Sequence, residues 1–216
     1  MYTAILLAGG QGTRSGFKES KVLVKIKGKA LIEYSIDVFT VDPDCDEIVL
    51  VVRKEDASMM VTRYASRVDH VVIGGDLRQD SVYAGLKVAR SDFVFVHDGA
   101  RPYVSEKMLL DVKAALSQCD AVGVAVPVVD TVKRVVDGFF VEDVDREGLV
   151  LMQTPQAFKR DVLLQAYQKV GKNVYTCDVT LVRATCDCKV KMVEGSRRNS
   201  KLTRKEDLKL LELMGL

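Results

Sequence analysis

Short apolar runs that alternate with amphipathic segments restrict the fold of this chain more than any other feature of its sequence. The runs are rich in β-branched and aliphatic residues and cover residues 4–8, 48–52, 70–73, 93–97, 121–128 and 190–193. Continuous apolar strands separated by helices are typical of a mostly parallel sheet that helices cover on both faces. No Pro-, Gly- or Ser-rich linker interrupts the pattern, so we predict one Rossmann-like α/β domain over residues 1–216.

Helical patterns occupy most of the intervals between these runs. Apolar residues at helical spacing predict helices at 31–39, 82–89, 108–116, 159–170, 179–184 and 205–214. Ser81 is placed to cap the second helix, and Thr203 and Glu206 have the spacing of a capping box before the last one. In a sheet of this class ligands bind beyond the carboxyl ends of the strands, so the residues that follow each strand are the candidates for function.

Residues 131–148 break the alternation. Asp137-Gly138 lies between two β-rich segments and is a strong signal for a two-residue hairpin turn. Such a hairpin would carry Phe139 and Phe140 near its tip, and these large apolar side chains need a cover. We expect a protruding β-hairpin arm that a second copy of the chain covers, which makes the protein a homodimer. The alternative is a hairpin that folds back on its own domain.

The first strand leads into a glycine-rich loop. Ala8 is followed by Gly9, Gly10 and Gly12, and then by the cations Arg14 and Lys21. Exposed backbone N–H groups beside fixed positive charge suit a polyphosphate. The spacing matches neither G-x-x-x-x-G-K-[ST] nor the three glycines of a dinucleotide fingerprint. The alternative is a plain glycine turn with solvated basic residues.

Polar groups also follow the third and fourth apolar runs. Asp76 and Ser81 come after Gly74-Gly75 and are candidates to bind a base or ribose, although ordinary loop chemistry would explain them equally. Asp98 ends a buried strand, which is a common place for a carboxylate that holds Mg²⁺ against phosphates, and Arg101 adds a bidentate donor for an anion. We assign His97 no chemical role.

Composition excludes several other classes of protein. The chain has 32 Lys and Arg against 30 Asp and Glu, a net charge of +2, so no overall field favours nucleic acid or an anionic membrane. The sequence predicts no transmembrane segment and no signal peptide, which leads us to expect a cytoplasmic protein. The five cysteines form no C-x-x-C pair and are expected to be reduced thiols; a zinc site at Cys177, Cys186 and Cys188 is the less favoured alternative.

Several motifs together resemble one enzyme family. They are Leu7-Ala8-Gly9-Gly10-x-Gly12-x-Arg14 with Lys21, Gly74-Gly75-x-x-Arg78-Gln79-x-Ser81-Val82, His97-Asp98-Gly99-Ala100-Arg101-Pro102, Asp130-Thr131-Val132-Lys133, Thr154-Pro155-Gln156-Ala157-Phe158 and Asn199-x-Lys201. In order and spacing they resemble the 2-C-methyl-D-erythritol 4-phosphate cytidylyltransferases, over essentially the whole chain. The first motif occurs in many sugar-nucleotide transferases, whereas the later ones are far more specific.

The resemblance implies transfer of CMP from CTP to 2-C-methyl-D-erythritol 4-phosphate, with release of pyrophosphate, in the non-mevalonate route to isoprenoids. It implies a CTP site at Ala8, Gly9, Gly10, Gly12, Asp76 and Ser81, catalytic cations at Arg14, Lys21, Arg146 and Lys201, a polyol phosphate site at Asp98, Arg101, Thr131 and Thr154, and Mg²⁺ near Asp98. Thr131 and Arg146 would come from the arm of the partner subunit.

The sequence departs from the usual family pattern at a few positions. Ser20 and Val22 flank Lys21 where the family usually has Pro and Gln, Cys177 replaces an acidic residue, and Gly99 replaces an alanine. None of these changes removes a charge assigned to phosphate binding. Two alternatives stay open, namely a ribitol-5-phosphate cytidylyltransferase and a regulatory module that binds CTP without turning it over.

Overall fold

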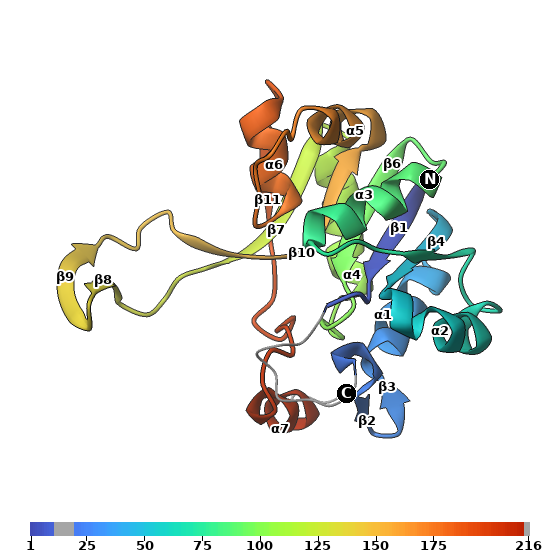
Figure 1. The fold of residues 1–216 in the computed structure, drawn as a ribbon. Helices are drawn as coiled ribbons and strands as arrows, with labels where there is room; N and C mark the ends of the chain where they lie inside the picture. The colour runs from blue at the N-terminus through green and yellow to red at the C-terminus, as the bar shows by residue number, and fades with distance from the viewer. Residues whose placement is uncertain (11–19, 214–216) are drawn as a thin grey trace.

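A seven-stranded sheet forms the centre of the computed structural model, which describes residues 1–10 and 20–213 (Figure 1). The strand order is β11-β7-β10-β6-β1-β4-β5. The strands are β1 (Tyr2–Leu7), β4 (Cys45–Val52), β5 (His70–Ile73), β6 (Phe93–Asp98), β7 (Ala121–Pro127), β10 (Val150–Lys159) and β11 (Val190–Glu194). All neighbours pair in parallel except β10, which runs antiparallel between β6 and β7. The predicted mostly parallel sheet is confirmed.

Strand β10 is the element of this sheet that the sequence pattern did not predict. Its centre reads Gln153-Thr154-Pro155-Gln156, which lacks an apolar run and contains a proline that cannot donate to a ladder. The pairing of β10 with β7 shifts register between Met152 and Gln156, so the irregular centre lies outside the regular ladder. The polar residues of this segment are buried in the structure, where they contact the functional site.

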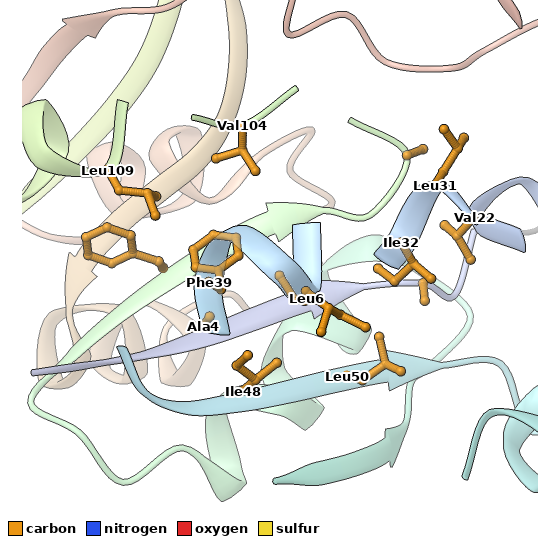
Figure 2. Close-up of a cluster of buried hydrophobic side chains, with 14 of the residues drawn as sticks. Ala4, Leu6, Val22, Leu31, Ile32, Phe39, Ile48, Leu50, Val104 and Leu109 are labelled. Atoms are coloured by element: carbon orange, nitrogen blue, oxygen red, sulfur yellow. The ribbon is translucent and has the colours of Figure 1, made fainter. Parts of the chain in front are cut away.

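Helices cover both faces of the sheet, as expected. One buried cluster joins alternate residues of β1 to α1 (Leu31–Val41), α2 (Ala57–Tyr64), α4 (Glu106–Leu116) and α7 (Glu206–Leu213). The other cluster joins the opposite face to α3 (Arg78–Val88), α5 (Arg160–Gln168) and α6 (Asp178–Thr185). Figure 2 shows the first cluster, in which Phe39 and Ile32 of α1 lie over Leu6 of β1 and Leu50 of β4.

Two helix starts differ from the sequence expectation. Helix α3 begins at Arg78, so Ser81 lies inside the helix rather than at its cap, and the Asp80 carboxylate accepts the Leu77 N–H at 3.2 Å instead. Before α7, the backbone N–H and the hydroxyl of Thr203 both donate to Asp207, at 2.8 and 2.6 Å. The predicted box with Glu206 was therefore wrong by one residue, because the helix begins only at Glu206.

Several short elements lie between residues 21 and 56. The 3₁₀ helices are η1 (Lys21–Leu23) and η2 (Lys54–Asp56), and β2 (Lys25–Ile26) pairs antiparallel with β3 (Lys29–Ala30). All five cysteines are free thiols. Within the described residues no helix has both the length and the apolar character needed to cross a membrane.

The predicted hairpin is present and projects from the sheet. Strands β8 (Val132–Val136) and β9 (Phe139–Val144) pair antiparallel, and Asp137 and Gly138 form the turn with φ values of 50° and 85°. Positive φ at both positions is what the type I′ form of a two-residue hairpin turn requires. Figure 1 shows the arm extended away from the rest of the chain. Phe139 is 75% exposed and Phe140 77%, so the alternative of a hairpin packed on its own domain is wrong.

We predict that Gly85→Val lowers the free energy of unfolding by about 1–3 kcal/mol, the usual effect of overpacking a core. A Cβ at Gly85 would lie 2.7 Å from Cγ2 of Ile5 and 2.9 Å from Cγ2 of Val51, so α3 would have to move off the sheet. Urea unfolding measures the change. The control is Lys87→Val, which places the same residue on the exposed side of the same helix and should cost much less. Equal losses in the two variants would contradict the packing explanation.

Candidate active site

A cleft of about 940 Å³ opens beyond the carboxyl ends of β1, β5 and β6. Strand β1 pairs with β4 on one side and β6 on the other, so this is where the strand order reverses and where α/β sheets bind ligands. The described residues that line the cleft are Leu7, Gly9, Gly10, Ser20, Lys21, Val22, Gly75, Asp76, Leu77, Arg78, Ser81, Asp98, Ala100, Lys201, Thr203 and Arg204.

The first wall of the cleft comes from the loop after β1. The buried Ala8 donates its N–H to the carbonyl of Val51 at 2.7 Å, which fixes where the loop leaves the sheet. Gly9 and Gly10 then line the cleft, and among the described residues no atom beyond its chain neighbours lies within 4 Å of the position that a Cβ of Gly10 would take. Gly12 and Arg14, which the sequence predicts as site residues, lie outside the described residues.

Ser20 and Lys21 also line the cleft, at the start of the short helix η1. The hydroxyl oxygen of Ser20 is buried and has no hydrogen-bond partner among the described residues. A buried hydroxyl without a partner is costly, so it marks a position where a ligand can supply the missing contact. The sequence motifs identified Lys21 but treated Ser20 only as a departure from the family pattern.

The second wall is the loop between β5 and α3. A Cβ at Gly74 would lie 2.5 Å from Oγ of Ser81, and one at Gly75 would lie 2.4 Å from Cβ of Asp80. These glycines are therefore needed for the close packing of α3 against its own loop, and Gly75 also lines the cleft. Asp76 and Ser81 both line the cleft, and the Ser81 hydroxyl donates to the Gly75 carbonyl at 3.4 Å.

Asp98 ends β6 and has three cations around its carboxylate. Lys201 Nζ lies 2.8 Å from Oδ2, Arg101 Nε 3.8 Å from Oδ2, and Arg78 Nε 3.5 Å from Oδ1. Burial alone would raise the pKa of Asp98, but the charges of Lys201 and Arg78 outweigh it and hold the pKa below its ordinary value. Asp98 is therefore ionised. The sequence motifs did not identify Arg78 as one of its partners.

Asp98 does not fit the role of a metal ligand. Its charge is already balanced by neighbouring cations, which would repel Mg²⁺. The described residues also contain no group of three His, Cys, Asp or Glu side chains close enough to bind a metal together. Asp76 is the other acidic residue among the described residues that line the cleft.

Behind Asp98, the buried His97 connects two strands. Its Nε2–H donates to the carbonyl of Arg101 at 3.0 Å, so its Nδ1 accepts from the hydroxyl of Thr154 at 3.1 Å. Thr154 in turn accepts the backbone N–H of Asp98 at 3.0 Å. Burial lowers the pKa of His97 to about 4, which keeps the ring neutral at physiological pH. His97 thus holds Thr154 and the turn that carries Arg101.

Arg101 and Asn199 hold the loop that carries Lys201. Arg101 Nη1 donates to the Asn199 carbonyl at 2.7 Å, and the Asn199 side chain donates to the Thr154 carbonyl at 2.8 Å. Asn199 is fully buried. Arg101 and Thr154 therefore lie directly behind the cleft wall, and their contacts position Lys201 beside Asp98.

Thr131 and Arg146 are separate from the residues that line the cleft. Both lie at the base of the arm and are exposed, and the Arg146 guanidinium donates to the carbonyl of Val129. Of the site residues that the sequence predicts, the structure brings Gly9, Gly10, Lys21, Asp76, Ser81, Asp98 and Lys201 together in the cleft and places Ala8, Arg101 and Thr154 next to it.

We predict that His97 makes stability depend on pH between about 6.5 and 4. In this range the unfolded chain binds a proton at His97 that the folded chain does not, so stability falls as the pH is lowered, by up to about 1.4 kcal/mol per pH unit. Carboxyls with lowered pKa values, such as Asp98, lose their contribution only at lower pH. Urea unfolding at pH 7 and pH 4.5 measures the slope.

His97→Asn should reduce this slope, because the replacement removes the group that binds the additional proton in the unfolded chain. Identical slopes in the wild-type chain and His97→Asn would show that His97 does not titrate as described.

Comparisons with known proteins identify the same family as the sequence motifs. The family model described as IspD, 2-C-methyl-D-erythritol 4-phosphate cytidylyltransferase, matches residues 2–214. A protein of that name from Geobacillus thermodenitrificans is 41% identical and one from Bacillus mycoides 38%, each over 98% of this chain and 95–96% of the relative.

Solved structures agree with this result. A crystal structure of 4-diphosphocytidyl-2C-methyl-D-erythritol synthase from Anaerococcus prevotii has a TM-score of 0.85 at 30% identity, and covers 98% of this chain and 96% of that one. The bifunctional IspDF of Campylobacter jejuni has a TM-score of 0.83 at 30% identity, over 96% of this chain and 53% of that one. This chain belongs to the 2-C-methyl-D-erythritol 4-phosphate cytidylyltransferase family.

Proposed function

We propose that this chain transfers CMP from CTP to 2-C-methyl-D-erythritol 4-phosphate and releases pyrophosphate, as a step of the non-mevalonate route to isoprenoids. The observation that carries the proposal is the cleft at the reversal of strand order, where Lys21 faces a cluster of Arg78, Asp98 and Lys201. Family membership over residues 2–214 supports the same activity. The free cysteines agree with work in the reducing cytoplasm.

CTP occupies the half of the cleft formed by the first two loops. Backbone N–H groups of the loop at Gly9, Gly10 and Gly12 bind the triphosphate, Ala8 anchors the start of this loop through its own hydrogen bond to Val51, and Arg14 and Lys21 bind the α-phosphate. Asp76 and Ser81 bind the cytidine. The hydroxyl of Ser20, which has no hydrogen-bond partner in the described part of the chain, adds a donor beside Lys21. This assignment places the leaving pyrophosphate among backbone donors and positive charge, which a helix or loop of this type provides.

The polyol phosphate occupies the other half, around Asp98. Lys201 is the nearest cation to Asp98 and binds the substrate together with it, while Arg101 and Thr154 hold the loops that form this wall. Thr131 and Arg146 of the partner subunit complete the acceptor site. The position of their own chain's arm, away from the rest of the molecule, supports a role in the neighbouring site (Figure 1).

These residues suit a direct displacement at phosphorus. A phosphate oxygen of the acceptor attacks the α-phosphorus of CTP in line with the departing pyrophosphate. Two anions have to approach each other, so most of the barrier is electrostatic, and fixed cations lower it without rearrangement. Lys21, Lys201 and Arg14 are the charges that would stabilise the transition state. The step needs no covalent nucleophile from the protein.

Magnesium accompanies CTP in this proposal rather than binding to a site made by side chains. The charge balance around Asp98 argues against a protein-built metal site among the described residues. Mg²⁺ commonly binds through substrate phosphates and water, with few protein ligands. When bound, the ion neutralises charge on the triphosphate.

We also propose that the protein is a homodimer in which residues 131–148 form a dimerisation arm on a single domain of residues 1–216. The arm exposes Val135, Val136, Phe139, Phe140 and Val141, each more than half exposed. A cluster of exposed apolar side chains of this kind on a hairpin marks a protein interface. The described residues of the same chain leave it uncovered, and a second copy supplies a cover with closed two-fold symmetry.

A rate assay separates this function from its alternatives. The wild-type chain is given CTP, Mg²⁺ and either methylerythritol phosphate or ribitol 5-phosphate, and pyrophosphate release is followed. We expect kcat/KM to be at least about 100-fold higher for methylerythritol phosphate, since a site built to bind one set of hydroxyls discriminates strongly. Equal or reversed values would favour the ribitol enzyme, and binding of CTP without turnover would favour a regulatory module.

The shared site predicts recovery of activity when two inactive variants are mixed. Lys21→Ala removes a cation of the core and Arg146→Ala one of the arm, and each should lower kcat by at least about 100-fold. If each site combines one core with the partner's arm, a mixed dimer contains one intact site. Random exchange makes half of the dimers mixed, so about a quarter of all sites should recover.

The mixing experiment requires proof that subunits have exchanged, which two affinity tags of different kinds provide. If Arg146 acts on its own chain, every site in the mixture carries one lesion and activity stays at the level of the single variants. No recovery after verified exchange would therefore contradict the shared site.

A further inference from the structure

Arg78 lies between two carboxylates at the border of the two halves of the cleft. Its Nη1 donates to Oδ2 of Asp178 at 2.7 Å, and its Nε lies 3.5 Å from Oδ1 of Asp98. Arg78 is the first residue of α3 and directly follows the loop that carries Asp76. One guanidinium thus connects the loop proposed to bind cytidine with the carboxylate at the centre of the acceptor half.

Asp178 is buried so completely that it holds Arg78 firmly. Its side chain is 1% exposed, and the hydroxyl of Tyr167 donates to its other oxygen, Oδ1, at 2.7 Å. Both carboxylate oxygens are therefore occupied, one by a neutral donor and one by the guanidinium. A buried carboxylate with these partners is expensive to separate from its cation, so Arg78 has little freedom to turn away from Asp98.

The neighbouring Gln79 strengthens the same attachment. Its side-chain amide donates to the Asn173 carbonyl at 3.1 Å and accepts the Tyr175 N–H at 3.0 Å. Arg78 and Gln79 together fasten the start of α3 to the connection between α5 and α6. These contacts explain why the sequence motif contains the pair Arg78-Gln79, and the explanation does not involve nucleotide binding.

The two oxygens of Asp98 have different partners. Oδ1 faces Arg78, whereas Oδ2 faces Lys201 at 2.8 Å and Arg101 at 3.8 Å. Because Arg78 is held by a buried ion pair, it restrains rotation of the Asp98 carboxylate. That restraint keeps Oδ2 directed at Lys201, the cation proposed to bind the acceptor.

We propose that Arg78 is a positioning residue of the acceptor site, which acts through Asp98 and is itself held by Asp178 and Tyr167. The proposal rests on the function proposed above and adds to it a residue of the cleft wall to which no substrate contact was assigned. The proposal gives one role to a series of contacts, which fix the acceptor-binding cation relative to the nucleotide loop. The series is Tyr167–Asp178–Arg78–Asp98–Lys201.

Steady-state kinetics with CTP and methylerythritol phosphate tests this assignment. Arg78→Gln should raise KM for methylerythritol phosphate or lower kcat by about 10- to 100-fold, the range expected when a charge-assisted hydrogen bond, here that of Arg78 to Asp178, is lost together with the ion pair to Asp98. KM for CTP should change by less than about 3-fold. Arg183→Gln, the same replacement at an exposed position of α6, is the matched control and should leave all three constants unchanged.

Arg78→Gln leaves Asp178 buried without its cation, which can itself prevent folding. The double variant Arg78→Gln/Asp178→Asn removes both charges, and Asn keeps the shape of Asp178, so the double variant should fold better than the single variant. The proposal expects the double variant to retain the acceptor defect. A double variant with wild-type kinetics would overturn the proposal, because Asp98 would then need no support from Arg78.

A double-mutant cycle between Arg78→Gln and Asp98→Asn distinguishes positioning from a general structural effect. If Arg78 acts through Asp98, its replacement in the Asp98→Asn background should alter the acceptor kinetics by less than about 3-fold, whereas independent effects would multiply. The same four chains are compared by urea unfolding, where a direct contact predicts non-additive shifts of the midpoint.

The unfolding cycle needs no substrate, so it tests the contact between Arg78 and Asp98 even if the proposed function is wrong. If the wild-type chain turns over neither polyol phosphate, the proposed function fails, and the positioning role in that reaction fails with it. If the wild-type chain is active and both cycles are additive, the function stands and the role of Arg78 is overturned. Non-additive results in both cycles support the proposal.

Discussion

The buried carboxylate of Asp98 is the constraint on which the described part of the cleft depends. Moving an uncompensated carboxylate out of water costs several kcal/mol, so fixed cations have to accompany it. Arg78 comes from α3, Arg101 from the turn after β6, and Lys201 from the loop before α7. A single requirement for charge compensation thus joins three segments that are far apart in the sequence. The three cations outnumber the two carboxylates that they contact, Asp98 and Asp178, which leaves a positive excess for substrates.

The fold was largely predictable because most of its strands are short runs of apolar, β-branched residues that the sequence shows directly. For five of the six predicted apolar runs, both ends lie within two residues of the ends of a strand of the sheet. The sixth run, 48–52, corresponds to β4, which begins three residues earlier, at Cys45. Strand β10 was missed because its centre is polar. Gln153, Thr154 and Gln156 are buried only because distant segments satisfy them, such as Ser196 for Gln153 and the N–H of Val179 for Gln156. A local pattern carries no sign of such partners.

The sequence predicted the loops of the candidate site but not the contacts between their side chains. Glycines and charges at strand ends identified the loops, and Lys21, Asp76, Asp98 and Lys201 do meet in one cleft. The sequence did not show how the charges are paired. Arg78 and Asp178 are 100 residues apart, and their contact is created by the packing of α3 against the start of α6. The expectation of a metal at Asp98 was reasonable for an acid at a strand end, but the number of cations around it depends on tertiary structure.

The exposure of the arm constrains the surface that covers it. Phe139 and Phe140 are consecutive in β9, so their side chains point to opposite faces of the hairpin, yet both are about three-quarters exposed. A hairpin that lay flat on another surface would bury one face and leave the other in water. A cover for both faces has to enclose the arm from two sides. In the proposed dimer, two copies with arms extended in the same way each enclose the other's arm, which would bring Arg146 at the arm's base within the neighbouring subunit's reach.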